Sequence, residues 1–292
     1  MSHLLPSASS TDEGTRNAAV AVLPVGSFEQ HGDHLPLATD SMIAVTIARE
    51  IADAYNLFLL PPVTIGCSHE HAGIVGTVSI SATTLHAIIT DIAASLAANG
   101  IHRLLIVNGH GGNYVLSNVV QEASVTEPRM ALFPGSTDWR NARAAGNLTT
   151  DQHDDMHAGE LETSILLHAL PDVVRASFQQ ADHDAPDRPH LLSLGMRAYT
   201  VNGTIGRPSL ATAEKGQGRP GVVGSRSRQL HRTSLSAVAS LLIKRRALVR
   251  HRSVACPLMY PRVLYLGSLF CCPMKRSVSV SYSIGSSCSI SI

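Results

Sequence analysis

The chain has 292 residues, and its 23 Lys and Arg nearly balance its 22 Asp and Glu, so the formal net charge is +1. A hydrophobic fraction of 44% is ordinary for a globular protein and leaves enough apolar residues for a sizeable core. No apolar run reaches the roughly 18 residues that a transmembrane helix needs, and the polar N-terminus lacks the pattern of a secretory signal. These features favour a cytoplasmic protein with no membrane partner.

The charge is distributed unevenly along the chain. Residues 1–216 hold all 22 acidic residues and 11 basic ones, which gives −11, whereas residues 217–292 hold 12 basic residues and no acidic one, which gives +12. Cys67 is the only cysteine of the acidic part, and a body with one cysteine fits a reducing, cytosolic setting. We therefore predict a disordered leader over 1–17, a folded domain over 18–216 and an atypical basic tail over 217–292.

The tail is unusual for a folded segment because it has no acidic residue and holds four of the five cysteines. We interpret it as the product of a shifted reading frame or as a recently acquired segment. The alternative is a basic interaction element that binds nucleic acid or anionic membrane. Our expectation is that the protein has no nucleic-acid partner.

Strand and helix patterns alternate along the folded domain. The predicted strands cover 18–25, 57–60, 104–107 and 131–133, and the predicted helices cover 41–54, 83–99, 113–123 and 160–170. Residues 67–81 are predicted to be a loop that leads into a strand, and residues 134–154 a long polar loop. The alternation predicts a single-domain α/β fold with three layers, α/β/α, around a mostly parallel sheet.

The segment after the first predicted strand concentrates charged and imidazole side chains. Residues 23–40 read LPVGSFEQHGDHLPLATD, and Glu29 and His31 are two residues apart. In an extended backbone these two side chains point the same way, and Asp40 can fold back to them after the loop at Pro36. Mixed oxygen and nitrogen ligands of this kind suit divalent Zn, Mn or Fe. The alternative is a polar surface loop.

Two later segments favour a single shared site. Residues 104–113 read LLIVNGHGGN and place His110 after a buried strand, whereas residues 156–164 read MHAGELETS and place His157 and Glu162 at the start of a helix. In open parallel sheets, ligands bind beyond the carboxyl ends of the strands. Taken alone, His157 is also compatible with a structural histidine at a helix start.

Together, the EQHG…D, NGHGGN and HAGExETS segments resemble the creatininase family of metal-dependent amidohydrolases, over about residues 19–216. This resemblance implies that 18–216 is a catalytic domain with an α/β fold and two divalent metal ions, Zn, Mn or Fe. It further implies cleavage of a C–N bond in a small amide substrate, and a homo-oligomer, typically a hexamer. The HGGN form matches the wider family, and the chain is also similar to peptidases that process the mycofactocin precursor peptide.

The resemblance also implies metal-ligand roles for individual residues. Asp40 would bridge the two metals, Glu29 and His110 would complete one, and His31 would serve the other. Creatininase itself has a glutamate where this chain has Gly112, so the second metal needs another carboxylate. Glu162 is our choice and Glu160 the alternative, because residues two apart on a helix point about 200° apart.

His157 and a second group of residues complete the implied site. His157 would act as general acid or base, together with Glu162 near the reaction. Ser68, His71 and Thr77 match a family segment that lines the substrate pocket. We therefore predict a metal-dependent amidohydrolase that cleaves a small, possibly cyclic, amide with a metal-activated water. The alternatives are a peptidase of the mycofactocin-precursor type and a non-catalytic metal-binding protein inactivated by its C-terminus.

Overall fold

The computed structural model describes residues 4–218, so the predicted tail lies outside the described residues except at its first two positions. The strands in this range are β1 (Ala21–Val25), β2 (Phe58–Leu59), β3 (Leu104–Asn108) and β4 (Met130–Phe133). The α-helices are α1 (Ser10–Arg16), α2 (Thr39–Tyr55), α3 (Ala82–Ala98), α4 (Val115–Ala123), α5 (Ser136–Ala145), α6 (Glu160–Ala169) and α7 (Leu191–Leu194). Short 3₁₀ helices cover His69–His71, Pro171–Val173, Ala176–Gln180, Met196–Ala198, Pro208–Leu210 and Lys215–Gly218.

The strands form one parallel sheet in the order β2-β1-β3-β4. The central strand β1 pairs with β3 along its whole length, from Ala21 opposite Leu104 to Val25 opposite Asn108. Every residue of β1 is buried, as expected for a parallel strand with helices on both faces. The carboxyl ends of β1 and β3 therefore lie side by side, and the loops that follow them share one edge of the sheet.

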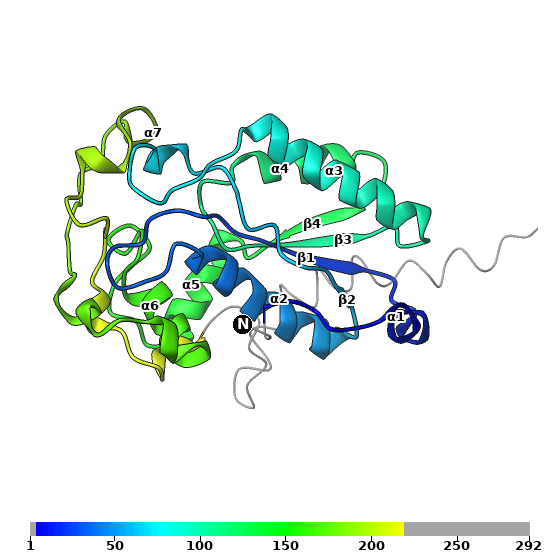
Figure 1. Cartoon of the computed structure of the whole chain (residues 1–292), viewed down its shortest axis with the longest axis horizontal. Coiled ribbons are helices and arrows are strands. Elements are labelled where there is room, and N and C mark those ends of the chain that lie inside the picture. Colours follow the sequence, from blue (N-terminus) through cyan, green and yellow to red (C-terminus); the bar gives the residue numbers. More distant parts are fainter. Residues whose placement is uncertain (1–3, 219–292) are drawn as a thin grey trace, which may run out of the picture. The chain divides into compact units, whose positions relative to one another are not determined.

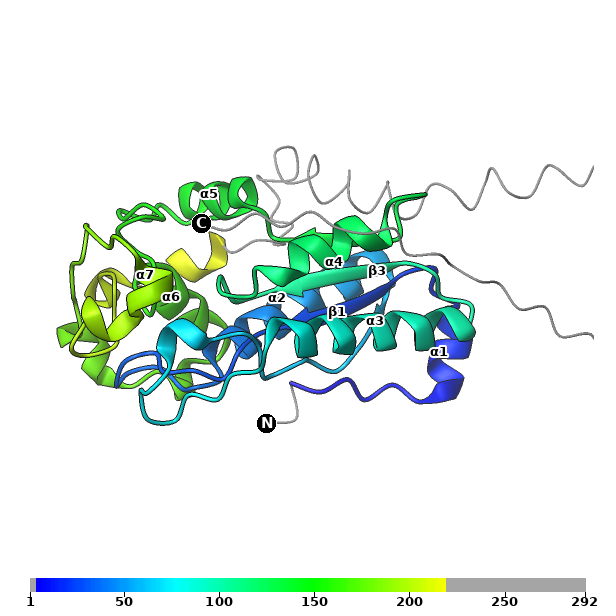
Figure 2. The same cartoon turned by 90° about the horizontal axis from the view of Figure 1, so that it is seen from above.

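Helices cover both faces of the sheet. Figures 1 and 2 show α3 and α4 on one face and α2 on the other, with α6 next to α2. Alternate residues of β1 enter the two cores: Val22 packs with α2 and α6, and Leu23 packs with α3 and α4. The predicted α/β/α arrangement with a parallel sheet is confirmed. Among the described residues, no helix has both the length and the apolar character needed to cross a membrane.

Helix α1 corrects the prediction of a disordered leader over 1–17. Its first turn has a reciprocal cap, because the Ser9 amide donates to the Asp12 carboxylate at 2.7 Å and the Asp12 amide donates to Ser9 Oγ at 3.3 Å. No residue of α1 is buried. The helix therefore lacks the apolar periodicity on which the sequence prediction depends.

Helix α5 likewise lies within the predicted polar loop over 134–154. The Gly135 amide donates to the Asp138 carboxylate at 2.8 Å and caps the first turn. Only Ala142 and Arg143 of this helix are buried, so its sequence reads as polar. The strand expected near the end of residues 67–81 is also reduced, to one isolated bridge between Val78 and Phe28.

Candidate metal centre

Glu29 and His31 lie in the extended loop that follows β1. The Glu29 amide donates to the Leu37 carbonyl at 3.0 Å and holds this backbone in place. His31 Nδ1 lies 3.0 Å from the Glu29 carbonyl oxygen, and its Nε2 lies 3.1 Å from Asp40 Oδ1. A backbone carbonyl that accepts from one ring nitrogen aims the other, which is the usual arrangement of a metal-binding histidine.

Asp40 sits in the first turn of α2, close to the ends of β1 and β3. Gly109 permits this approach, since a Cβ there would come within 2.3 Å of the Asp40 carbonyl oxygen. Ser27 Oγ donates to Asp40 Oδ2 at 2.6 Å. His31 Nε2 lies against Asp40 Oδ1 at 3.1 Å, and His110 Nδ1 lies against Oδ2 at 3.0 Å. One buried carboxylate thus faces two imidazoles, as a bridging ligand must.

His110 is positioned by the turn after β3. The Asn108 side chain donates to the His110 carbonyl at 2.7 Å and accepts from the His110 amide at 3.3 Å. His110 Nε2 lies 2.9 Å from the Cys67 carbonyl oxygen. Because a carbonyl can only accept, Nε2 carries a proton, and Nδ1 is the nitrogen that faces Asp40.

The two glutamates of α6 occupy different surroundings. The Glu160 carboxylate accepts from the Thr150 amide at 2.9 Å and from the Thr150 hydroxyl at 2.6 Å, and it pairs with Lys215. Burial opposes its charge, but Lys215 and Thr150 outweigh this and lower the pKa of Glu160. Glu160 is therefore fully partnered away from the metal candidates.

Glu162 points instead toward His31 and Asp40. Its Oε2 accepts from the Ala158 amide at 2.7 Å. Its carboxylate lies in one group with His31 and Asp40, with ligand atoms all within 4.8 Å of one another. Of the two alternatives from the sequence, only Glu162 lies in this group.

The candidate ligands form overlapping groups of three. Glu29, Asp40 and His110 form the first, His31, Asp40 and Glu162 the second, and Glu29, His31 and His157 the third. Asp40 belongs to the first two. Both Glu29 carboxylate oxygens are buried without a well-formed hydrogen bond, although His110 Nε2 lies 3.2 Å from Oε2. Buried carboxylates that lack donors, beside imidazole nitrogens, fit a bound divalent cation.

The electrostatics of the cluster also favour a cation. Burial raises the pKa of Glu29 to about 7, and the charge of Asp40 adds to this. Burial likewise raises the pKa of Glu162 to about 7. Although burial opposes positive charge, Asp40 raises the pKa of His31 to about 9, and Glu29 raises the pKa of His110 to about 10. The carboxylates thus attract positive charge, which either protons or metal ions can supply.

Gln30 connects the cluster to two further histidines. Its side-chain amide donates to His71 Nδ1 at 3.0 Å and to the Gly203 carbonyl at 2.9 Å. Since His71 Nδ1 accepts, the His71 proton is on Nε2, which lies 3.2 Å from Glu29 Oε1. The Gln30 backbone carbonyl lies 2.7 Å from His157 Nε2, so this nitrogen donates. Gln30 thereby fixes the tautomers of both histidines.

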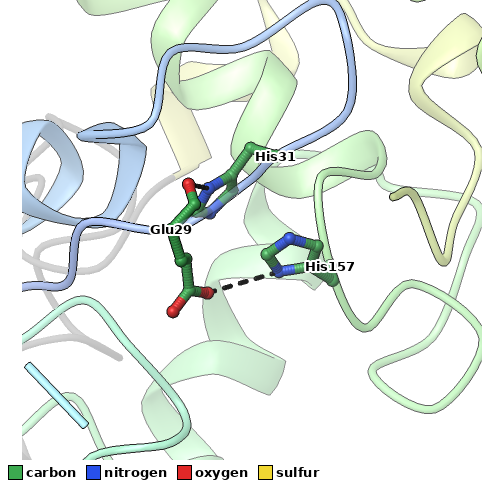
Figure 3. A group of neighbouring side chains, drawn as sticks. All are labelled: Glu29, His31 and His157. Carbon is green, nitrogen blue, oxygen red and sulfur yellow. Dashed lines mark hydrogen bonds and ion pairs between the residues drawn. The ribbon is translucent and has the colours of Figure 1, made fainter. Parts of the chain in front are cut away.

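His157 presents its other nitrogen to the cluster. Figure 3 shows the His157 ring beside Glu29 and His31, with Nδ1 3.8 Å from Glu29 Oε1. The His31 and His157 ring centroids are 4.2 Å apart. Burial, reinforced by the nearby positive charge of His31, holds the pKa of His157 well below its usual value. A neutral His157 with a free Nδ1 can accept a proton or bind a metal.

A cavity of about 300 Å³ opens onto the cluster. His110, His157 and Glu162 contribute to its wall on the side of the metal candidates. Trp139 and Arg143, both from α5, line another part. The cavity can hold a small molecule or part of a larger one next to the candidate ligands.

The three residues expected to bind substrate do not line this cavity. Ser68 and His71 are buried, and His71 faces Glu29. Thr77 Oγ1 accepts from the Gln30 amide at 3.1 Å. Through these contacts the segment supports Glu29 and Gln30, and its role in substrate binding stays a prediction.

Sequence reasoning missed several residues of this site. Gln30 stood within a quoted motif, but its role depends on His71 and Gly203, which are far away in the chain. Trp139 and Arg143 lie in the segment predicted to be a loop. Glu70, which belongs to none of the motifs, has a side chain that is only 14% exposed and lies near His110.

Comparisons with known proteins agree with this geometry. A family model described as Creatininase: Creatinine amidohydrolase matches residues 7–219. The mycofactocin precursor peptide peptidase of Mycobacterium ulcerans is 37% identical over 67% of this chain and 78% of its own. The creatinine amidohydrolase of Pseudomonas putida is 26% identical over 68% of this chain and 83% of its own.

The fold comparison points the same way. A solved structure titled Creatininase Mn superposes with a TM-score of 0.62 at 22% identity, over 73% of this chain and 90% of that one. The family match covers well over half of the chain, and the 37% identical relative is matched over most of its length. The chain therefore belongs to the creatininase family of amidohydrolases, which hydrolyse C–N bonds.

Proposed function

We propose that this protein hydrolyses an amide C–N bond with two divalent metal ions held by Glu29, His31, Asp40, His110 and Glu162. The observation that supports this most directly is the position of Asp40, whose two carboxylate oxygens face His31 and His110 at 3.1 and 3.0 Å. Solved creatininases include a manganese form and a Zn–Zn form. The mixed nitrogen and oxygen ligands here suit Zn, Mn or Fe.

The residues around the cluster divide the remaining work. When bound, the ions would supply an activated water and a Lewis acid for the amide carbonyl. His157 is the proposed general acid or base, because Nε2 is fixed on the Gln30 carbonyl and Nδ1 is free. Glu162 holds its place through the Ala158 amide. The cavity beside Trp139 would hold the substrate.

A peptide amide is the second candidate substrate. The 37% identity to a mycofactocin precursor peptide peptidase exceeds the 26% identity to a creatinine amidohydrolase. Both reactions break a C–N bond, so the same ligand set and His157 serve either. What differs is the group that the cavity must accept, a small cyclic amide or the end of a peptide.

A screen of metal-reconstituted protein tests the proposal. Full-length protein loaded with Zn²⁺ or Mn²⁺ is assayed on creatinine, formamides and short peptides, and new amines and carboxylates are measured. Metal-dependent turnover of any of these that disappears in Asp40→Ala supports the proposal. Turnover without metal, or none on any amide by protein shown to bind two ions, would count against it.

Two further proposals come from the family. We propose a cytoplasmic homo-oligomer, typically a hexamer, that acts on a small-molecule amide without nucleic acid or membrane. Light scattering of the metal-loaded protein measures its mass directly. An active monomer would contradict the oligomer.

A further inference from the structure

The 3₁₀ helix His69–His71 places a fourth carboxylate next to the cluster. Glu70 Oε1 lies 3.5 Å from His110 Nε2, and the Glu70 side chain is 14% exposed. It is not among the groups of three candidate ligands found in the described residues. Helix α7 packs against this 3₁₀ helix and stabilises the segment that carries Glu70.

Space for the Glu70 carboxylate depends on a glycine. A Cβ at Gly112 would lie 2.1 Å from Glu70 Oε1, 2.4 Å from His110 Nε2 and 2.7 Å from the Cys67 carbonyl oxygen. The neighbouring Gly111 has open space at the same position. The Glu70 carboxylate, the His110 ring and the Cys67 carbonyl are thus packed around a site where only hydrogen fits.

We infer that Glu70 is a positioning residue for His110: its carboxylate and the Cys67 carbonyl together keep the proton on His110 Nε2, so that Nδ1 is presented to the metal shared with Asp40. The inference rests on the proposed metal centre. Three oxygens surround His110 Nε2: the Cys67 carbonyl at 2.9 Å, Glu29 Oε2 at 3.2 Å and Glu70 Oε1 at 3.5 Å. The carbonyl and the ionised carboxylates can only accept, so all three favour the tautomer with a free Nδ1.

A carboxylate outside the ligand set has a known effect on a histidine ligand. It fixes the ring orientation and tautomer and increases the basicity of the coordinating nitrogen, and its loss typically weakens metal binding about 10–100-fold. Glu70 is suited to this because the Cys67 carbonyl is neutral and Glu29 is itself a proposed metal ligand, so Glu70 is the carboxylate near Nε2 that lies outside the ligand set. Glu70 is not among the residues that line the cavity described above, so its effect on turnover passes through His110.

Zn²⁺ affinity measured by competition with a chromophoric chelator tests the inference in full-length protein. Glu70→Ala is expected to weaken binding about 10–100-fold, and Glu70→Gln, which keeps the shape without the charge, by less. Glu122→Gln is the matched control, because Glu122 also pairs with a histidine, at 2.9 Å from His86 Nε2, on the protein surface. We expect wild-type affinity for that variant.

Long-range proton–nitrogen NMR of the Zn²⁺-loaded protein supplies a readout that a purely structural role would not change. The wild type should show His110 protonated at Nε2, and Glu70→Ala should show a mixed or shifted signal. Unchanged affinity and an unchanged His110 signal in Glu70→Ala would overturn the inference, as would unfolding of both Glu70 variants without metal. If wild type binds no Zn²⁺, the proposed metal centre itself fails.

Discussion

Glu160 and Glu162 stand two residues apart on α6, yet they face two regions of opposite character. The Glu160 region is saturated, since Thr150 and Lys215 supply donors to the carboxylate. The Glu162 region is unsaturated: its carboxylate lies with Asp40 in a buried cluster, where Glu29 lacks well-formed hydrogen bonds. The Glu160 carboxylate has several donors, whereas the donor found for Glu162 is the Ala158 amide.

This difference gives a physical criterion for separating structural from functional carboxylates. A saturated carboxylate has a lowered pKa, as Glu160 does, and its charge stabilises the fold. A carboxylate whose desolvation is offset by fewer donors has a raised pKa, as Glu162 does, and a cation can stabilise its charge. We therefore expect changes at the first region to affect stability and changes at the second to affect metal binding and turnover.

The largest expected effect comes from removing the shared ligand. Asp40→Ala should lose most bound metal and lower kcat/KM by at least about 10³-fold, because metal ions contribute several kcal/mol to the transition state. Metal analysis and steady-state kinetics on the substrate found in the screen measure this. Asp33→Ala, from the same loop but outside the ligand groups, is the control. Two retained ions with full activity in Asp40→Ala would rule out the bridging role.

The next effect concerns proton transfer. His157→Ala should keep its bound metal and lower kcat about 10²–10⁴-fold, the usual size of a general acid–base contribution. Kinetics and metal content must be measured on the same sample, because Glu29 and His31 form a possible metal group with His157. His153→Ala, which changes an exposed histidine, is the control and should have wild-type kcat and metal content. Loss of metal in proportion to activity would make His157 a ligand.

A smaller effect is expected from filling the space beside His110. Gly112→Ala should weaken Zn²⁺ binding about 10–100-fold, because its Cβ would meet both Glu70 and His110. Gly111→Ala adds the same methyl group in open space and should bind like wild type. Isothermal titration of the two variants compares them directly. Equal affinities would show that the packing at Gly112 is not needed for the metal site.

The smallest effect lies in the saturated region. Glu160→Gln should lower the free energy of unfolding by about 2 kcal/mol at neutral pH, through loss of charged hydrogen bonds. Because the pKa of Glu160 is lowered in the fold, its contribution is full above the unfolded pKa and is lost as the pH falls through the folded pKa. Chemical unfolding from pH 7 into acid should therefore show the two proteins converging below about 4.5. A constant difference at all pH values would contradict this.

The sequence predicted the parts of this protein that depend on local patterns. Apolar runs identified β1 and β3, and parallel strands bring their following loops together, so Glu29 and His110 could be expected to meet. Helix geometry showed that only one of Glu160 and Glu162 could face them. Such inferences need strand direction and helix periodicity, which a sequence carries.

The rest depends on contacts between distant segments. His71 turns toward Glu29 because Gln30 donates to its Nδ1, and no local pattern encodes that contact. The Glu70 carboxylate can lie near His110 because Gly112 has no side chain to occupy that space. Helix α5 was missed because it buries little apolar surface. Loop conformations of this kind follow from tertiary hydrogen bonds and packing.

Metal content after reconstitution, measured side by side in wild type, Glu160→Gln and Glu162→Gln, tests the division between the two regions most directly. All three full-length proteins are loaded with Zn²⁺, passed through a desalting column and analysed by mass spectrometry for metal per chain. We expect wild type and Glu160→Gln to retain the same metal content and Glu162→Gln to lose the ion that His31 shares. Equal metal in all three proteins, or loss in Glu160→Gln alone, would contradict the account.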